Sequence, residues 1–390
     1  MNMIITNGTI VTDRLIPNGT IVVIGDKILY VGDEIEGQRI LKAADKNVFK
    51  IIDARGGYIA PGLIDVHIHG SDGVDLMDGK EESIRTVARY VVKYGVVGFL
   101  PSTVTASPEK TRKVSQLISD FVGRDDEAEV LGIHLEGPYI NEKRKGAQYG
   151  PEIRQADLDE LENLYTILGD KLRLVTLAPE VPKGLEAVDW LVDRGITVSI
   201  GHSDATYEQA VEGFQRGISH GTHTFNGMRG LHHREPGVVG AILATPGIYA
   251  ELIADLVHVH PGAIRVLLAS KDVNEIVLIT DAVQATGLPD GEYVLGDQRI
   301  FVKEGAARLA EGNLAGSTLN LLQAVRNMVE VLGLSLPDAF RMASLNPAKS
   351  IGVENKGWIQ EGNDADFVIM SPDFEVYMTI IGGTIAYSAD

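Results

Sequence analysis

The most informative absence in this 390-residue sequence is cysteine, which does not occur at all. This excludes disulfide bonds, a thiolate nucleophile and zinc sites that use cysteine ligands. No apolar run reaches the ~20 residues that a membrane-spanning helix needs. The opening residues, MNMIITNG, lack the basic and apolar regions of a signal peptide. We therefore expect a cytoplasmic protein that has no membrane partner.

Basic residues are also scarce, with 35 Lys and Arg against 54 Asp and Glu, which gives a net charge of −19. This charge argues against binding to nucleic acid or to an anionic membrane surface. It leaves an anionic small molecule possible, because one cleft can be locally basic. Hydrophobic residues make up 44% of the chain, which is enough for a large core and argues against disorder.

The two ends of the chain share one pattern. Residues 21–24 and 28–31 are apolar runs separated by Gly-Asp-Lys, which predicts a hairpin. Near the other end, residues 376–381 and 384–387 flank Gly382-Gly383, a pair typical of a two-residue hairpin turn. We expect residues 1–57 and 357–390 to form one small β domain with both termini at the surface.

The middle of the chain, residues 58–356, alternates short β-type runs with helical patterns. The eight runs span residues 64–69, 97–104, 130–136, 172–178, 197–202, 221–225, 249–255 and 276–281. Eight alternations over this length match a (β/α)8 barrel. An open doubly wound sheet is the alternative, although its Gly-x-Gly-x-x-Gly fingerprint is absent after the first run.

Helix signals support this alternation. Residues 83–94 have an apolar face, and residues 157–168 open with acidic side chains that suit the positive end of a helix dipole. Ser317 is expected to cap the helix that follows it, which runs through Val329.

Histidine and carboxylate side chains occur at the ends of several runs, and all ten histidines lie between residues 67 and 260. His67 and His69 form His-x-His, whose two side chains share one face of a strand. Glu136, His202 and Asp281 end other runs, and His223 lies within the run 221–225. Each alone is compatible with a structural role, but in a barrel all six converge on the mouth where such enzymes place their sites. Imidazole and carboxylate ligands suit Zn²⁺, Fe²⁺, Mn²⁺ or Co²⁺, which lower the pKa of bound water to about 7.

Five motifs occur in an order that resembles one enzyme family. They are His-Leu-Glu-Gly-Pro-Tyr at 134–139, Gly-His-Ser at 201–203, His-Thr-Phe-Asn-Gly-Met at 223–228, His-Arg-Glu-Pro-Gly at 233–237 and Leu-Ala-Gly-Ser at 314–317. With the His-x-His and the Lys-Gly-x-Ile-x-x-Gly-x-Asp-Ala-Asp segment at 356–366, the chain resembles the amidohydrolase superfamily. Within it, the chain is most similar to the N-acetylglucosamine-6-phosphate deacetylase family.

The resemblance implies an α/β fold, a metal-dependent hydrolase (β/α)8 TIM barrel with a small β-sandwich domain built from both chain ends. It implies hydrolysis of N-acetyl-D-glucosamine 6-phosphate, an amino-sugar phosphate, to D-glucosamine 6-phosphate and acetate. It also implies one or two divalent ions per subunit. The principal ligands would be Glu136, His202 and His223, and His67 with His69 matches a second-metal pair.

The same resemblance implies the remaining roles. Asp281 matches the catalytic acid/base, and His258 matches the residue that polarises the acetyl carbonyl. Arg234 matches a phosphate-binding arginine that the family supplies from the neighbouring subunit, which implies a homodimer. The residues that match other sugar-phosphate contacts are Ala147, Gln148, Asn226, Gly227, Leu314, Ala315 and Gly316.

Two basic clusters and the remaining histidines complete the set of candidate site residues. Arg234 lies in a cluster with Arg229, His232 and His233, and Lys143-Arg144-Lys145 lies in a loop that can cover the site or simply be solvated. Of the other histidines, we expect His134 and His220 in the core near the ligands, and His232 and His260 at the periphery.

Three alternatives stay open. Another amidohydrolase, such as a dihydroorotase, a D-aminoacylase or a nucleobase deaminase, is disfavoured because many of those use a carbamylated lysine where this chain has Glu136. Deacetylation of N-acetylgalactosamine 6-phosphate differs by one hydroxyl orientation, which the sequence does not resolve. A non-enzymatic assembly protein is disfavoured because all six ligand-type positions are filled.

Overall fold

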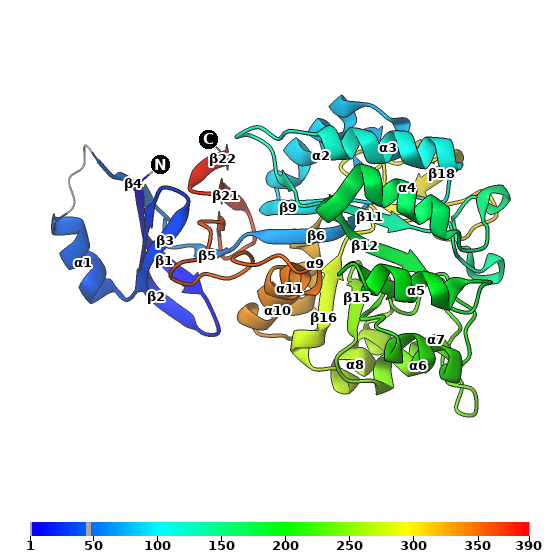
Figure 1. Ribbon diagram of the computed structural model, residues 1–390. Helices are drawn as coiled ribbons and strands as arrows, with labels where there is room; N and C mark the ends of the chain where they lie inside the picture. Colours follow the sequence, from blue (N-terminus) through cyan, green and yellow to red (C-terminus); the bar gives the residue numbers. More distant parts are fainter. Residues whose placement is uncertain (1, 44–47, 390) are drawn as a thin grey trace.

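The computed structural model describes residues 2–43 and 48–389 (Figure 1). It consists of a sheet that joins both ends of the chain, at the left of Figure 1, and a larger body of alternating strands and helices. In the described residues, no helix is both long and apolar enough to traverse a bilayer.

The terminal sheet has eight strands in the described residues, in the order β22-β21-β20-β5-β1-β2-β3, with β4 paired to β1. They are β1 (Met3–Val11), β2 (Leu15–Ile24), β3 (Lys27–Gly32), β4 (Lys50–Asp53), β5 (Tyr58–Pro61), β20 (Phe367–Met370), β21 (Val376–Ile381) and β22 (Thr384–Ser388). Both predicted hairpins are confirmed, because β2 pairs antiparallel with β3 and β21 with β22. The helix α1 (Glu34–Ala43) packs against β2.

The turn between β21 and β22 explains the glycine pair. Gly382 and Gly383 have φ angles of +53° and +71°, the left-handed values that a type I′ turn requires at both central positions. A Cβ atom on Gly383 would lie 2.2 Å from the carbonyl oxygen of Gly25. Glycine at position 383 therefore allows the C-terminal hairpin to lie close against the turn of the β2–β3 hairpin.

Parallel strands form the larger body. They are β6 (Leu63–Ile68), β9 (Val96–Pro101), β11 (Ile133–Glu136), β12 (Leu172–Leu177), β13 (Thr197–Ile200), β14 (His220–Gly221), β15 (Tyr249–Ile253) and β16 (Ile276–Ile279). β6 pairs with β9, which also pairs with β10 (Glu129–Val130), and β11 to β16 pair in chain order. Single bridges connect the two sets, from Ser102 to His134 and from Ile68 to Ala282. Each of the eight predicted runs overlaps a strand, although β14 shares only Gly221 with the run 221–225. The sequential strand order differs from a doubly wound sheet, in which the order reverses.

Helices cover the outside of these strands (Figure 1). They are α2 (Glu81–Val92), α3 (Pro108–Asp120), α4 (Leu158–Leu168), α5 (Gly184–Val192), α6 (Tyr207–Gln215), α7 (Gly237–Ala244), α8 (Pro261–Ser270), α9 (Leu321–Glu330), α10 (Leu336–Ala343) and α11 (Leu345–Ser350). Short 3₁₀ turns are η1 (Leu76–Asp78), η2 (Glu142–Arg144), η3 (Gly150–Glu152), η4 (Gly169–Lys171) and η5 (Val273–Glu275).

Two of the predicted helices are confirmed, but the predicted cap of the third is wrong. α2 and α4 lie where periodicity predicts them, with Asp157 capping α4. The cap of α9 is Asn320, whose side chain accepts a hydrogen bond from the Gln323 amide at 2.9 Å. Ser317 instead bridges to Ala282 and donates its hydroxyl to the Thr280 carbonyl at 2.6 Å. The chain therefore stays extended beside β16 before the helix begins.

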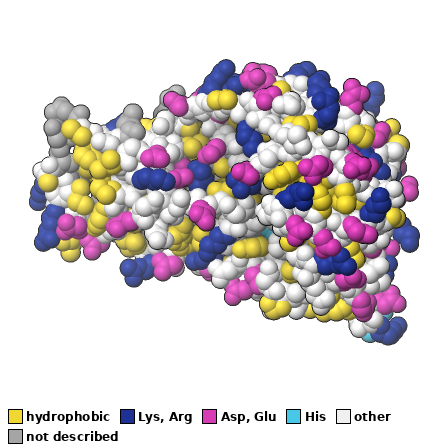
Figure 2. Space-filling view, in the orientation of Figure 1, with side chains coloured by type: hydrophobic (Ala, Val, Ile, Leu, Met, Phe, Trp, Pro, Cys, Tyr) yellow, Lys and Arg dark blue, Asp and Glu magenta, His cyan; other side chains and the backbone are white. Residues whose placement is uncertain are grey.

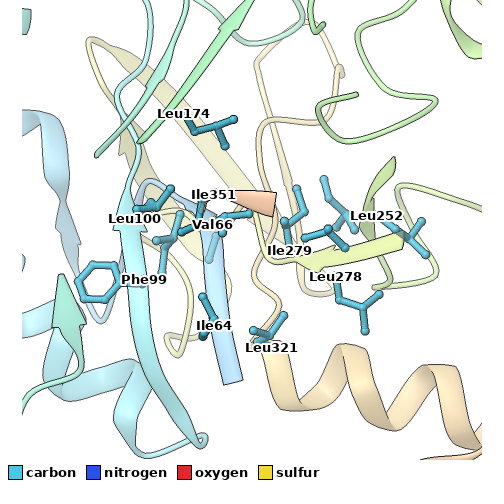
Figure 3. Packing of buried hydrophobic residues seen from close by; sticks show 14 of the residues in the cluster. Ile64, Val66, Phe99, Leu100, Leu174, Leu252, Leu278, Ile279, Leu321 and Ile351 are labelled. Atoms are coloured by element: carbon cyan, nitrogen blue, oxygen red, sulfur yellow. The ribbon is translucent and has the colours of Figure 1, made fainter. Parts of the chain in front are cut away.

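Apolar side chains hold strands and helices together. Ile64 on β6, Leu278 on β16 and Leu321 at the start of α9 are buried in one cluster (Figure 3). A second cluster lies within the terminal sheet and includes Ile5 on β1 and Phe367 on β20. The core is thus divided between the two parts of the molecule.

Small antiparallel elements were not expected from the sequence. The largest follows β16 and contains β17 (Gly291–Leu295), β18 (Gln298–Lys303) and β19 (Ala306–Arg308); the other pairs β7 (Gly70–Ser71) with β8 (Val74–Asp75). The three-stranded element brings Leu295 and the segment that carries Asn313 beside the site described next.

Candidate active site

Ligand-type side chains lie at the carboxyl ends of the parallel strands. Glu136 is the last residue of β11, and His202, His223 and Asp281 each follow a strand by two residues. These three have φ angles of +48°, +34° and +51°. Left-handed backbone is uncommon for residues other than glycine, and it concentrates at functional sites. The sharp turn after each strand brings these side chains together with Glu136.

The first of two ligand groups in the described residues comprises His67, His69 and Asp281. The Nε2 atoms of His67 and His69 are 3.1 Å apart. Oδ1 of Asp281 lies 3.1 Å from Nε2 of His69 and 3.6 Å from Nε2 of His67. The histidines come from one face of β6, as the His-x-His spacing predicts.

The second group comprises Glu136, His202 and His223. Oε1 of Glu136 lies 3.1 Å from Nε2 of each histidine, and those two Nε2 atoms are 3.2 Å apart. The other carboxylate oxygen of Glu136 lies 3.3 Å from Nε2 of His69. Glu136 therefore connects the two groups.

The Nδ1 contacts of the four ligand histidines show that their Nε2 atoms can bind cations. In each histidine Nδ1 faces an oxygen that can only accept a hydrogen bond, so Nδ1 carries the proton and the neutral ring has its lone pair on Nε2. The acceptors are Glu251 for His67 (3.4 Å), the Ser102 carbonyl for His69 (3.2 Å), the Arg144 carbonyl for His202 (2.9 Å) and the Asn226 carbonyl for His223 (3.1 Å). The lone pairs face one another and the carboxylates. Nitrogen ligands about 2.0–2.1 Å from a tetrahedral metal lie about 3.3 Å apart, so the spacing suits divalent ions.

The charges in this set perturb one another. Burial favours a raised pKa for Glu136, but His67 and the hydrogen bonds from His202 and His223 hold the pKa well below its usual range. Burial alone would lower the pKa of His69, yet Asp281 and Glu136 raise it to about 9. Glu136 and Asp281 thus favour a positive charge placed between them.

A cavity of about 290 Å³ opens above both groups. Its volume is near the lower end of the ~300–1,000 Å³ typical of small-molecule sites. In the described part of the chain it is lined by His69, Val104, Glu136, Gly146, Ala147, Gln148, His202, His223, Asn226, Gly227, His258, Asp281, Leu295, Asn313, Leu314 and Gly316. This lining contains no lysine or arginine of the described residues.

Most residues expected to contact a sugar phosphate line this cavity, with two exceptions. Ala315 is fully buried, and its amide donates to the Ala307 carbonyl. Arg234 is exposed in a loop away from the lining, where its guanidinium contacts His233. Gln148 lines the cavity, but its amide nitrogen donates to Glu136 at 2.6 Å and its amide oxygen accepts from the Thr105 backbone at 2.6 Å. The structure therefore ties Gln148 to a ligand carboxylate.

His258 faces the cavity from the segment after β15. Its Nδ1 donates to Asp255 at 2.7 Å, and both its own amide and that of Val257 donate to the other oxygen of Asp255. Burial works against the ionised form of Asp255, but the hydrogen bond from His258 lowers the pKa of Asp255 overall. Asp255 thus fixes the direction of the His258 ring.

The loop that carries Lys143-Arg144-Lys145 lies beside the site. Its charges are partly balanced by Asp204, which contacts Lys143 and Arg144, while the Arg144 carbonyl accepts from His202. The side chains of this basic run therefore do not line the cavity, although the following residues, 146–148, do.

The other histidines lie largely where the sequence predicts. His134 is buried between Ser102 and Thr176, and His220 is buried beside Glu251. His232 is exposed, and His260 caps α8.

Sequence reasoning missed Glu251, Asn313, Leu295, Gly146 and Val104. Glu251 had a usable signal, because it is a charged residue inside the apolar run Tyr-Ala-Glu-Leu-Ile on β15. The others had none, because loops from distant parts of the chain bring them to the cavity.

The fold and the ligand set together define the class: an α/β protein with a candidate divalent-metal site at the carboxyl ends of parallel strands. A family model described as the amidohydrolase family matches residues 58–386. The N-acetylglucosamine-6-phosphate deacetylase of Lysinibacillus sphaericus is 44% identical over 86% of this chain and 87% of its own length. The N-acetylgalactosamine-6-phosphate deacetylase of Escherichia coli O157:H7 is 40% identical over 84% of this chain and 87% of its own length.

A solved structure is similar over nearly the full length. It is a variant of N-acetyl-D-glucosamine-6-phosphate deacetylase from Mycobacterium smegmatis in complex with N-acetyl-D-glucosamine 6-phosphate. It superimposes with a TM-score of 0.90 and 30% identity, covering 99% of this chain and 100% of that one. The chain belongs to the amidohydrolase family, in the branch that contains N-acetylglucosamine-6-phosphate deacetylases.

Proposed function

We propose that this protein hydrolyses N-acetyl-D-glucosamine 6-phosphate to D-glucosamine 6-phosphate and acetate. The observation that carries the proposal is the pair of ligand groups joined by Glu136 at the base of a cavity of metabolite size. The relatives support the substrate, since one is named for this deacetylation and another was solved with this sugar phosphate.

The architecture proposed with this function is a (β/α)8 barrel, residues 58–356, with a β-sandwich of residues 1–57 and 357–390. The bridges from Ser102 to His134 and from Ile68 to Ala282 support closure of the strands into a ring. Hydrogen bonds that Ile28 of β3 exchanges with Asn363 and Gly362, just before β20, support curling of the terminal sheet. Cytoplasmic location stays a prediction from the sequence.

The ligand set supports one or two divalent ions, of Zn, Fe, Mn or Co, held by His67, His69, Glu136, His202, His223 and Asp281. An ion bound there supplies Lewis acidity, which lowers the pKa of water and polarises a carbonyl oxygen.

Asp281 is proposed as the general base and acid. Its carboxylate lines the cavity beside His69. It accepts the proton of the attacking water and returns that proton to the amide nitrogen as the carbon–nitrogen bond breaks, which releases acetate and the amine.

His258 is proposed to hold the acetyl oxygen. Because Nδ1 donates to Asp255, Nε2 donates to a carbonyl only when the ring is doubly protonated. Asp255 balances the positive charge of that form, and the charge stabilises the developing oxyanion.

The sugar is proposed to lie against Ala147, Gln148, Asn226, Gly227 and the 314–316 segment, most of which line the cavity. The buried position of Ala315 leaves Leu314 and Gly316 as the contacts from that segment.

The phosphate is proposed to bind Arg234 of a neighbouring subunit in a homodimer. Arginine binds phosphate strongly through paired hydrogen bonds, and among the described residues that line the cavity none is lysine or arginine. Residues 230–235 are exposed, and their loop before α7 projects from the lower right of the body (Figure 1). In Figure 2 histidine and basic side chains gather at this edge, in a surface of otherwise mixed charge.

Mixed dimers test this arrangement. Arg234→Ala should raise KM for the phosphorylated sugar at least tenfold while light scattering still reports a dimer. Co-expression of Arg234→Ala with Asp281→Asn subunits should restore activity, because the second subunit supplies the arginine to an intact Asp281 site. Mixed dimers whose kcat/KM is no higher than that of the Arg234→Ala parent would contradict donation across the interface.

The second candidate substrate is N-acetylgalactosamine 6-phosphate, because the E. coli relative is named for it. Acetate release should be measured from both phosphorylated sugars and from unphosphorylated N-acetylglucosamine. We expect the glucosamine derivative to give the highest kcat/KM. A higher kcat/KM for the galactosamine epimer would make N-acetylgalactosamine 6-phosphate the first candidate substrate. No acetate from any of the three sugars, with the protein loaded with metal, would overturn deacetylation.

A further inference from the structure

Glu251 is a buried carboxylate outside both ligand groups. It lies on β15 with 0% of its surface exposed. In the described part of the chain, it has no lysine or arginine partner; its contacts are His67, His220 and the backbone of His223. A buried carboxylate without a cationic partner is costly, so Glu251 requires positive charge nearby.

The contacts of Glu251 all come from hydrogen-bond donors. Oε2 lies 3.4 Å from Nδ1 of His67 and 3.2 Å from the backbone nitrogen of His223, and Oε1 lies 3.4 Å from Nδ1 of His220. The two oxygens of the Glu251 side chain therefore face three donors.

This contact distinguishes His67 from the other histidine ligands. His69, His202 and His223 direct Nδ1 to backbone carbonyl oxygens, whereas His67 directs it to a carboxylate. A carboxylate acceptor fixes the tautomer and makes the ligating nitrogen more basic.

Glu251 also links the two ligand groups. His67, of the first group, lies on β6, and His223, of the second, follows β14; β14 pairs with β13 and β15 but not with β6 among the described strands. The Glu251 carboxylate crosses between them. One side chain therefore supplies a hydrogen-bond acceptor to a member of each group.

We propose that Glu251 is a positioning residue that holds His67 as a metal ligand, so that retention of an ion at the His67–His69–Asp281 group depends on it. The proposal rests on the metal-dependent function proposed above. Glutamine at this position would offer one acceptor and one donor to three donors. If the amide nitrogen faces His67, that ring must move its proton to Nε2, which then cannot bind metal. If the amide nitrogen faces His220, His67 keeps an acceptor but loses the carboxylate that makes its ligating nitrogen more basic.

The test is a Co²⁺ titration of full-length, chelator-treated protein, followed by metal analysis and the visible Co²⁺ spectrum. Wild type should bind two ions per chain. Glu251→Gln should bind one tightly and the second 10–100-fold more weakly, with the spectrum of one site lost. The matched control is Glu127→Gln, which changes a buried carboxylate paired with Arg85; it should lower Tm and keep both ions.

The outcomes separate the two proposals. Two ions bound equally well by wild type and Glu251→Gln would overturn the role of Glu251 alone. Wild-type protein that binds a single ion would also overturn the role of Glu251, because there would be no second ion to retain. Wild-type protein that binds no ion would in addition overturn the metal-dependent function. Should Glu251→Gln fail to fold, Glu251→Asp keeps the charge but withdraws it by one methylene, and it should weaken the second ion while Tm stays near that of Glu127→Gln.

Discussion

Replacement of Asp281 by asparagine tests the proton-transfer role of this residue separately from its structural role. Asp281 has φ of +51°, and asparagine and aspartate are among the few residues that adopt this region readily. Its amide also donates to the His67 carbonyl at 2.8 Å, which the substitution preserves. Asparagine keeps an oxygen that can face His69 but cannot accept and return a proton. General acid–base catalysis contributes about 10²–10⁴-fold, so we expect kcat to fall about 10³-fold, or about 4 kcal/mol.

The assay is acetate release from N-acetyl-D-glucosamine 6-phosphate, with metal content measured on the same preparation. Metal per chain should stay close to wild type. Asp281→Ala provides a comparison, because it removes the ligand oxygen as well and should lose metal. A fully metallated Asp281→Asn enzyme whose kcat lies within tenfold of wild type would refute the assignment of Asp281 as base and acid.

Three further predictions concern stability and the ligand shell. Lys356→Ala should lower the free energy of unfolding by about 3 kcal/mol, because the Lys356 ammonium lies 3.0 Å from the buried Asp366 carboxylate and balances its charge. Urea unfolding measures this loss, and the control Arg326→Ala, which removes a partner of an exposed ion pair, should have little effect. Chelator treatment should lower Tm, because the free energy of unfolding falls by up to about 4 kcal/mol if ions were present at 1,000 times their Kd. Adding Zn²⁺ should restore Tm, and an unchanged Tm contradicts a bound ion. Gln148→Ala should weaken metal affinity about tenfold, because Glu136 loses a donor at 2.6 Å; equal Co²⁺ affinity argues against that role.

Local patterns predicted much of the fold. Alternating short apolar runs located all eight parallel strands, because a buried strand needs apolar residues on both faces. Glycine pairs and acidic caps located turns and helix starts. Ser317 misled because capping residues also bond elsewhere: its hydroxyl serves the Thr280 carbonyl, and Asn320 caps α9 instead.

The candidate site was predicted in part for the same reason. Glu136, His202 and Asp281 stand at strand ends, and in parallel strands those ends meet at one edge. Gln148 was expected against the sugar and lines the cavity, and the sequence did not predict that its side chain also bonds Glu136. That contact depends on how the 141–150 loop folds back, which no local pattern specifies.

The sequence alone determined which residues could bind metal and where strands begin, because these follow from side-chain chemistry and from periodicity along the chain. Tertiary structure decided that Nε2 atoms of His67, His69, His202 and His223 face one another, that Glu251 lies against His67, and that Arg234 stays outside its own cavity. These depend on distances between segments up to 184 residues apart. Such distances are set by the packing of all the parallel strands and their helices, because a side chain's partners are fixed only once the strands have assembled.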